Sequence, residues 1–265
     1  MILSYHAVPT EEEMFFISRP LRRLFIFARS PLEAGKSAHE TARRRIKCRD
    51  ALEPYLYANG IRFVRNTPDM TAASSIAQAN RLGGFDFYLA LHSNAAAPEN
   101  SGSVRGVLVF YYPTSAEGKR AADLFAANLK RVYPLPDLVR TVPTTALGEV
   151  RQPKYPANLL ELGYHDNYAD AAWVENNMDA IARELARSLT EYFGLPFIEP
   201  QPVVQGTVST SGSPLRLRAY PSAAGQTIAL MPNGASVTVY GTWQGWNVVH
   251  YNGSVGYAAE AYIES

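Results

Sequence analysis

A histidine and two glutamates stand where the ends of neighbouring elements would bring their side chains together. His92 ends the apolar run 85–91, Glu161 lies near the end of the run 158–162, and Glu40 opens a helix-like stretch after the first apolar run. Ligands of open α/β sheets bind at the carboxyl ends of the strands. Imidazole and carboxylate groups converging there suit a zinc ion, which keeps one position for water, with a further carboxylate as base.

Each of these residues alone also fits a structural role. A single histidine at a strand end is often a hydrogen-bonded core residue. Glu161, flanked by Leu160 and Leu162, also fits a buried partner of one of the arginines. Metal chemistry therefore depends on the three residues converging.

The elements that would position these residues alternate along the chain. Strand-like patterns occupy residues 24–28, 61–65, 85–92, 104–112 and 158–162, and helix-like patterns occupy 40–58, 71–82, 116–132 and 169–193. This alternation predicts an α/β fold with a mixed, mostly parallel sheet flanked by helices.

The pattern changes after residue 195. Residues 196–209 are rich in proline and small polar residues, which predicts a linker. About five short strands follow, with turns at 232–234 and at Asn252-Gly253, which predicts a small β-barrel. We therefore expect an N-terminal extension (1–22), an α/β domain (23–195), the linker (196–209) and a barrel domain (210–265).

Composition narrows the classes of partner. The 265 residues carry a formal net charge of +1 with 18% charged residues, so no global field favours nucleic acid or an anionic membrane. Cys48 is the single cysteine, which excludes an intrachain disulfide framework. Neither a signal peptide nor a membrane-spanning run is visible in the sequence.

Several motifs together resemble the zinc-dependent N-acetylmuramoyl-L-alanine amidases. They are VRNTPDM (64–70), Ala79-Asn80, FDFYLALHSNAA (85–96), GVLVFYYPTSAEGKRAADLFAANL (106–129) and PANLLELGYHDNYADAAWV (156–174). Their order and spacing match the family's, and this ordered set is more specific than any one motif.

The resemblance implies an enzyme that hydrolyses the amide between the lactyl group of N-acetylmuramic acid and L-alanine. It implies a Zn²⁺ cofactor held by a histidine, a glutamate and a second histidine, and a catalytic glutamate. By position, Glu40 corresponds to the ligand glutamate, His92 to the second ligand histidine and Glu161 to the catalytic glutamate.

One position departs from the family pattern. Arg29 stands where the first ligand histidine is expected, and arginine does not deprotonate to bind metal. His39, beside Glu40, or His6 are candidate replacements. A weak two-ligand site and a metal-free, catalytically silent domain remain alternatives, and in the silent domain Arg29 would pair with Glu40 or Glu161. Arg29 is thus also a candidate substrate-binding residue.

Other polar residues near the motifs have simpler expected roles. Asn94, two residues after His92, is a further candidate for substrate binding. His165 falls where the family has a variable residue, and His250 lies within a predicted strand, so both are expected to be structural.

The C-terminal region resembles bacterial SH3-type modules. Arg218, Trp246 and Tyr257 match the Arg, the Trp and an aromatic position of their pattern. Such modules often bind cell-wall peptides, which makes Tyr220, Trp243, Trp246 and Tyr257 candidate groove residues for peptidoglycan, although Trp246 is expected to be a core residue.

These resemblances place the site of action at the bacterial cell wall. The missing export signal favours a phage-type lysin, or a component of a phage-like particle, that stays cytoplasmic until release by another route. A secreted enzyme with a trimmed start is the alternative route. A wall-binding or structural protein built on an amidase fold without its metal is the second functional hypothesis. Nothing in the sequence fixes an oligomeric state.

Overall fold

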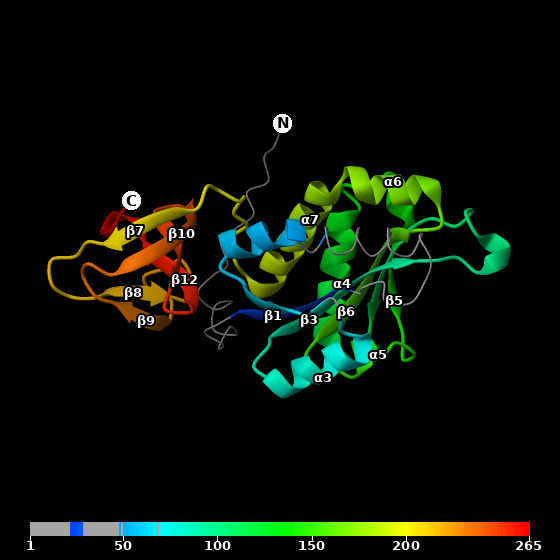
Figure 1. Ribbon diagram of the computed structural model, residues 1–265, viewed down its shortest axis with the longest axis horizontal. Helices are drawn as coiled ribbons and strands as arrows, with labels where there is room; N and C mark the ends of the chain where they lie inside the picture. The colour runs from blue at the N-terminus through cyan, green and yellow to red at the C-terminus, as the bar shows by residue number, and fades with distance from the viewer. Residues whose placement is uncertain (1–21, 29–47, 49, 68) are drawn as a thin grey trace.

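The computed structural model describes residues 22–28, 48, 50–67 and 69–265. Arg29, His39, Glu40 and His6, the positions that decide the predicted metal site, lie outside the described residues, as does most of the predicted N-terminal extension. The rest of the predicted α/β region and the whole C-terminal region are described (Figure 1).

A mixed sheet forms the centre of the first domain, as the alternation predicted. Its described strands are β1 (Arg23–Ala28), β2 (Arg62–Arg65), β3 (Phe87–Asn94), β4 (Val107–Tyr111), β5 (Val139–Pro143) and β6 (Ala157–Tyr164), in the spatial order β2-β1-β3-β6-β4-β5. β1, β2, β3 and β6 are parallel, whereas β4 runs antiparallel to β6 and parallel to β5. The parallel strands bring their carboxyl ends to one edge.

Helices cover both faces of this sheet. They are α3 (Ala72–Leu82), α4 (Ala116–Leu129), α5 (Gly148–Arg151), α6 (Tyr168–Asn176) and α7 (Met178–Phe193), with a further helical segment at 50–58. In Figure 1, α3 and α5 lie on one side of the sheet and α4 and α7 on the other. Within the described part of the chain, no helix is long and apolar enough to span a membrane.

Alternation along β3 divides the core into two layers. Phe87, Leu89 and Leu91 pack in the core shared with α4 and α7, and Tyr88 and Ala90 pack in the core on the α3 and α5 side. Both sets are fully buried, as expected for a strand covered on both faces. The even-numbered residues of β3 therefore face α3 and α5.

Local side chains fix where the helices begin and end. Thr71 accepts a hydrogen bond from the Ser74 amide in a capping box that starts α3, and Asn167 caps α6 by accepting from the amides of Ala169 and Asp170. Gly194, in the left-handed conformation at φ 65°, ends α7.

Two features of this domain differ from the sequence prediction. The predicted helix 169–193 is two helices, because Asn177 leaves the helical conformation (φ −128°, ψ 24°) and its side-chain amide donates to the Trp173 carbonyl. The edge strand β5 was not predicted, because its sequence VRTVP carries an arginine and a proline and only its first residue is buried.

The C-terminal region is a seven-stranded antiparallel sheet with its own core. Its strands are β7 (Val204–Val208), β8 (Leu215–Arg218), β9 (Thr227–Met231), β10 (Ser236–Trp243), β11 (Trp246–Tyr251), β12 (Ser254–Ala259) and β13 (Ile263–Glu264). Asn252 and Gly253 both have positive φ and join β11 to β12, which confirms the predicted hairpin.

The first of these strands falls inside the segment predicted to be a linker. β7 pairs antiparallel with β10, and Gly206 and Val208 are buried while the residues between and before them are exposed. This alternation is typical of a strand with one buried face. The sheet therefore begins before residue 210.

Short 3₁₀ turns occupy Pro98–Asn100, Pro136–Leu138 and Glu260–Tyr262.

Candidate functional site

The structure brings His92 and Glu161 side by side at the carboxyl ends of β3 and β6. They are direct partners in the parallel register of these strands. Alternation places both on the face where Tyr88 of β3 and Leu159 of β6 pack. Two residues 69 positions apart thus meet at the sheet edge where α/β folds bind ligands.

His92 is buried and its orientation is fixed by two contacts. Its Nε2 lies 2.9 Å from Oε1 of Glu149, and its ring packs against Phe27 at 5.4 Å between centroids. An ionised carboxylate only accepts hydrogen bonds, so this contact suits the tautomer that carries its proton on Nε2. The lone pair of Nδ1 is then the one that remains for a metal ion.

Glu149 is a site residue that the sequence did not suggest. It lies in the four-residue helix α5 and is only 7% exposed. Burial and the neighbouring Glu149 carboxylate raise the pKa of Tyr88, on the same face of β3 as His92. The GEVR segment is too short to show a helical period, and a lone glutamate has no sequence context that marks it. A buried carboxylate beside a strand-end histidine is visible only in three dimensions.

The donor types at this edge fit zinc. One imidazole is flanked by Glu161 on its neighbouring strand and bonded to Glu149, and zinc binds imidazole nitrogen and carboxylate oxygen. Among the described residues, no group of three or more His, Cys, Asp or Glu side chains is gathered closely enough to hold a metal. The other ligands implied by the resemblance, Glu40 with His39 or His6, lie outside these residues.

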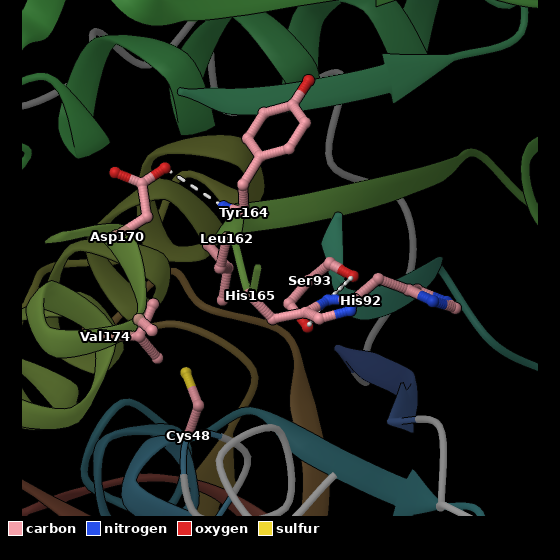
Figure 2. Close-up of a pocket in the computed structure, with 9 residues that line it drawn as sticks. Cys48, His92, Ser93, Leu162, Tyr164, His165, Asp170 and Val174 are labelled. Atoms are coloured by element: carbon pink, nitrogen blue, oxygen red, sulfur yellow. Dashed lines mark hydrogen bonds between the residues drawn. The ribbon is translucent and has the colours of Figure 1, made fainter. Parts of the chain in front are cut away.

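A small cavity lies beside His92 (Figure 2). Its volume of ≈ 20 Å³ is enough for about one water molecule. Its lining includes Cys48, His92, Ser93, Leu162, Tyr164, His165, Asp170, Ala171 and Val174.

His165 and Ser93 link this cavity to β3. The Nδ1 atom of His165 lies 3.4 Å from the Ser93 hydroxyl and 3.3 Å from the Ser93 carbonyl oxygen, and the His165 amide donates to the Asn94 carbonyl. These contacts tie the loop after β6 to the end of β3. The Asn94 side chain accepts a hydrogen bond from the Ala95 amide.

Asp170, within the last of the quoted motifs, holds the surrounding loops together. It is fully buried and accepts hydrogen bonds from four groups, the Arg105 guanidinium, the Tyr133 hydroxyl and the amides of Gly106 and Tyr164. The Tyr164 amide terminates β6, three residues after Glu161. Asp170 therefore positions the strand that carries Glu161.

The predicted groove aromatics all lie on the side of the barrel that faces the first domain. Tyr220, Trp243 and Trp246 are partly buried against the larger core of that domain, and Tyr257 is 1% exposed within it. The Tyr257 ring is therefore covered by protein in this arrangement.

Comparison with known proteins identifies both regions. Residues 44–191, more than half of the chain, match the profile of the N-acetylmuramoyl-L-alanine amidase family. The chain belongs to this amidase family. Residues 213–264 match the bacterial SH3 domain profile, so the barrel is an SH3 domain. The amidase match begins after Arg29, His39 and Glu40.

Solved amidase structures share the fold at low sequence identity. The amidase AmiC2 of Nostoc punctiforme superposes with a TM-score of 0.55 at 17% identity, covering 64% of this chain and 96% of that one. The catalytic domain of CwlV from Bacillus (Paenibacillus) polymyxa gives 0.56 at 19%, covering 66% and 100%. The catalytic domain of an endolysin targeting Clostridia difficile gives 0.54 at 18%, covering 64% and 97%. No curated protein sequence matches the chain.

Proposed function

We propose that this amidase-family protein hydrolyses the amide bond between N-acetylmuramic acid and L-alanine in peptidoglycan, with Glu161 as general base and a zinc ion as cofactor. The observation that carries the proposal is the pairing of Glu161 with His92 at the carboxyl edge of the sheet. Membership of the amidase family supplies the reaction class.

Each described residue has a defined task in this reaction. His92, with Nε2 bonded to Glu149, would bind zinc through Nδ1, together with Glu40 and His39 or His6. When bound, the zinc ion supplies a Lewis acid that polarises the scissile carbonyl and lowers the pKa of water. Glu161 accepts the proton of the attacking water and donates it to the departing L-alanine nitrogen.

Glu149 acts in this proposal as a positioning residue. A metal-binding histidine commonly donates its second ring N–H to a carboxylate, which fixes its tautomer and orientation. The 2.9 Å contact between Glu149 and His92 has this form, and both side chains are buried. Glu149 thus supports the metal-binding nitrogen without touching substrate.

We further propose that peptidoglycan is the partner and that the protein acts at the bacterial cell wall. The SH3 domain supports wall binding, with the partly exposed Tyr220 and Trp243 as contact candidates, and Arg29 and Asn94 as candidates near the reacting bond. A phage-type route to the wall is part of this proposal, and one solved structure of similar fold is the catalytic domain of an endolysin.

The alternative is an amidase fold that has lost its metal and binds the wall without cleaving it. The observation in its favour is Arg29, which stands where the first ligand histidine is expected. Glu161 would then serve as a charge partner and not as a base. The zinc content of the purified protein distinguishes the enzyme from this metal-free alternative.

The test uses the full-length protein and purified peptidoglycan. We expect about one zinc ion per chain and release of new L-alanine amino groups, with Glu161→Gln lowering the rate by ~10²–10⁴-fold. Glu260→Gln, an exposed change in the SH3 domain, is the matched control and should leave the rate unchanged. If the protein held no zinc and released no product, the enzymatic proposal would be rejected in favour of the metal-free alternative.

A further inference from the structure

The SH3 domain meets the amidase domain through an extensive seam of buried groups. Tyr257 in β12 donates a hydrogen bond of 3.0 Å to the carbonyl of Asn59, and its ring covers Gly60. The Tyr57 and Tyr240 rings, one from each domain, stack at 4.9 Å between centroids with 15° between their planes. The larger core cluster of the amidase domain includes Tyr257 and its neighbours in the barrel.

The barrel strands at the seam are buried on both faces. In β12, Val255 and Tyr257 pack in the amidase core, while Ala258 packs in the barrel's own core. In β11, Val248 packs in the amidase core and Val249 packs in the barrel's own core. A module that worked independently would expose one of these faces to water, so this burial pattern is typical of a permanent contact.

One close approach at the seam leaves little space for a side chain. A Cβ atom on Gly241 of β10 would lie 3.2 Å from Cγ2 of Ile198 and 3.6 Å from the carbonyl of Ala58. The φ angle of Gly241 is not positive, so the backbone itself does not require glycine there. Its small size therefore serves the contact between the domains.

The segment that connects the domains is fixed to the amidase domain by paired hydrogen bonds. The Asn59 side chain accepts from the Ile198 amide at 2.6 Å and donates to the Ile198 carbonyl at 2.8 Å. Asn59 is fully buried and Ile198 is 3% exposed. This part of the connection is ordered structure and not a flexible tether.

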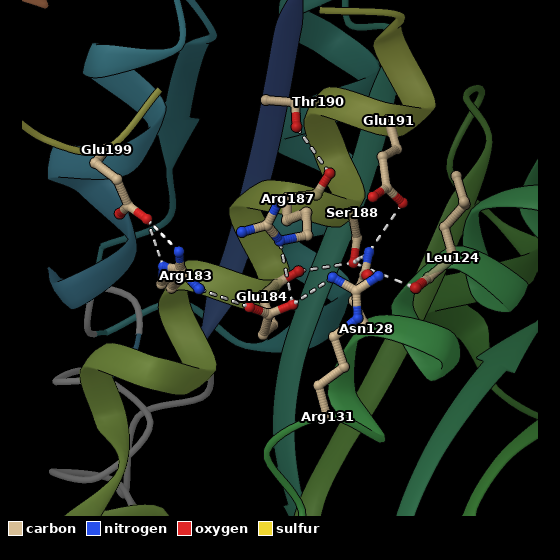
Figure 3. A network of polar contacts seen from close by, with 10 residues as sticks. All are labelled: Leu124, Asn128, Arg131, Arg183, Glu184, Arg187, Ser188, Thr190, Glu191 and Glu199. Atoms are coloured by element: carbon tan, nitrogen blue, oxygen red, sulfur yellow. Dashed lines mark hydrogen bonds and ion pairs between the residues drawn. The ribbon is translucent and has the colours of Figure 1, made fainter. Parts of the chain in front are cut away.

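A charged network on α7 contacts Phe197 and Glu199, the residues on either side of Ile198 (Figure 3). Glu199 forms an ion pair with Arg183, and the Arg187 guanidinium lies 4.2 Å from the centre of the Phe197 ring. The buried Glu184 carboxylate pairs with both arginines, which keeps their side chains in place. The Glu184 carboxylate is buried, so loss of an arginine partner would be costly there, whereas the Arg183–Glu199 pair is half-exposed and weaker.

We infer that the face of the SH3 domain formed by Tyr240, Gly241 and Tyr257 is a docking surface for the protein's own amidase domain, so that the two domains form one rigid body. The seam lies at Asn59 and Gly60, just before β2, and so at the amino ends of the parallel strands. His92 lies at their carboxyl ends, five residues along β3 from Phe87, a rise of ~17 Å. The barrel therefore stands at a fixed distance from the site, and Tyr257 serves this contact.

Backbone ¹⁵N relaxation on the full-length protein tests the inference without requiring enzymatic activity. We expect amides of both domains to report one rotational correlation time. Shorter values throughout the SH3 domain of the wild-type protein would overturn the inference.

Variants at the seam test whether these contacts hold the two domains together. Gly241→Leu should clash with Ile198 and release the barrel, shortening the correlation time of its amides while their chemical-shift dispersion shows that it remains folded. Tyr57→Ala is the second variant, for use if Gly241→Leu fails to fold. It removes the ring stack with Tyr240 at a partly exposed position and should also shorten the correlation time of the barrel amides. Tyr262→Ala, at an exposed barrel position, is the control and should change nothing. Seam variants that fold yet tumble as the wild type does would also count against the inference.

Discussion

Glu149 Oε1 and His92 Nε2 lie 2.9 Å apart, joining a one-turn helix to the end of a central strand across 57 residues of sequence. Both side chains are almost fully buried. This contact holds the imidazole ring in one orientation, and it supplies the first prediction.

Removal of the Glu149 carboxylate should weaken metal binding and the fold together. Glu149→Ala is expected to lower zinc affinity by roughly 10–100-fold. It should also cost ~1–3 kcal/mol of unfolding free energy because the buried Nε2–H loses its acceptor. Glu149→Gln keeps an acceptor oxygen and should lie closer to wild type. Competition with a zinc chelator and urea denaturation measure the two effects, and a Glu149→Ala protein with wild-type values for both would refute the assignment.

The Asp170 carboxylate should be among the most important for stability. Asp170→Ala leaves the buried Tyr133 hydroxyl and the partly buried Arg105 guanidinium without their acceptor and is expected to cost ~3–5 kcal/mol of unfolding free energy. Asp123→Ala is the matched control, because Asp123 makes an exposed i,i+4 ion pair with Lys119 that is screened by water and should change stability little. Equal losses in the two variants in chemical denaturation would contradict this ranking.

The Asp166 carboxylate should make stability depend on acid pH. Burial acts to raise its pKa, but hydrogen bonds from the amides of Gly102 and Ala96 outweigh that effect and lower it. A carboxyl whose folded pKa is depressed stabilises the fold fully above its unfolded pKa of ~3.9 and loses this contribution as pH falls through the folded pKa. The stability difference between wild type and Asp166→Asn should therefore be present at pH 6 and shrink below about pH 4. A difference in unfolding free energy that grows on acidification would show that this sign is wrong.

The Cys48 thiol should be inert in the folded protein. Burial raises its pKa to about 12, and the thiolate is the reactive form. Relative to an ordinary thiol of pKa ~8.5, the thiolate fraction near neutral pH falls by roughly three to four orders of magnitude. A colorimetric disulfide reagent should label the chain slowly at pH 8 and rapidly in urea, and Cys48 is the single cysteine, so the signal is unambiguous. Fast labelling of the native protein would show that the cavity beside His92 opens readily.

Much of the amidase fold follows from local sequence patterns. Strands β1, β3 and β6 are apolar runs, and α3 begins at a Thr-x-x-Ser cap, so short-range chemistry specifies them. The break at Asn177 was not predicted, because apolar residues continue at helical spacing on both sides of it. Local periodicity carries no information about a single residue that leaves the helix.

The candidate site was predicted only in part, because local patterns locate strand ends but not contacts between distant segments. The pairing of His92 with Glu161 follows from two strand ends in a parallel sheet, which the alternation of elements predicted. Glu149 and the contact between Tyr257 and Asn59 were not predicted, because each joins segments far apart in sequence with no periodic pattern. The roles of Arg29, His39 and Glu40 remain predictions.

Surface connections between domains usually tolerate changes in length, because each doubling of a flexible loop costs only about 0.6 kcal/mol. The two hydrogen bonds between Asn59 and Ile198 remove that freedom. Insertion or deletion of a single residue between Gly194 and Ile198 would place a different residue opposite the Asn59 side chain, or move Phe197 and Glu199 away from their arginines. The register of this short segment is therefore under the same kind of constraint as the register of a β-strand, and exchange of the C-terminal domain with that of another amidase-family protein would have to preserve it.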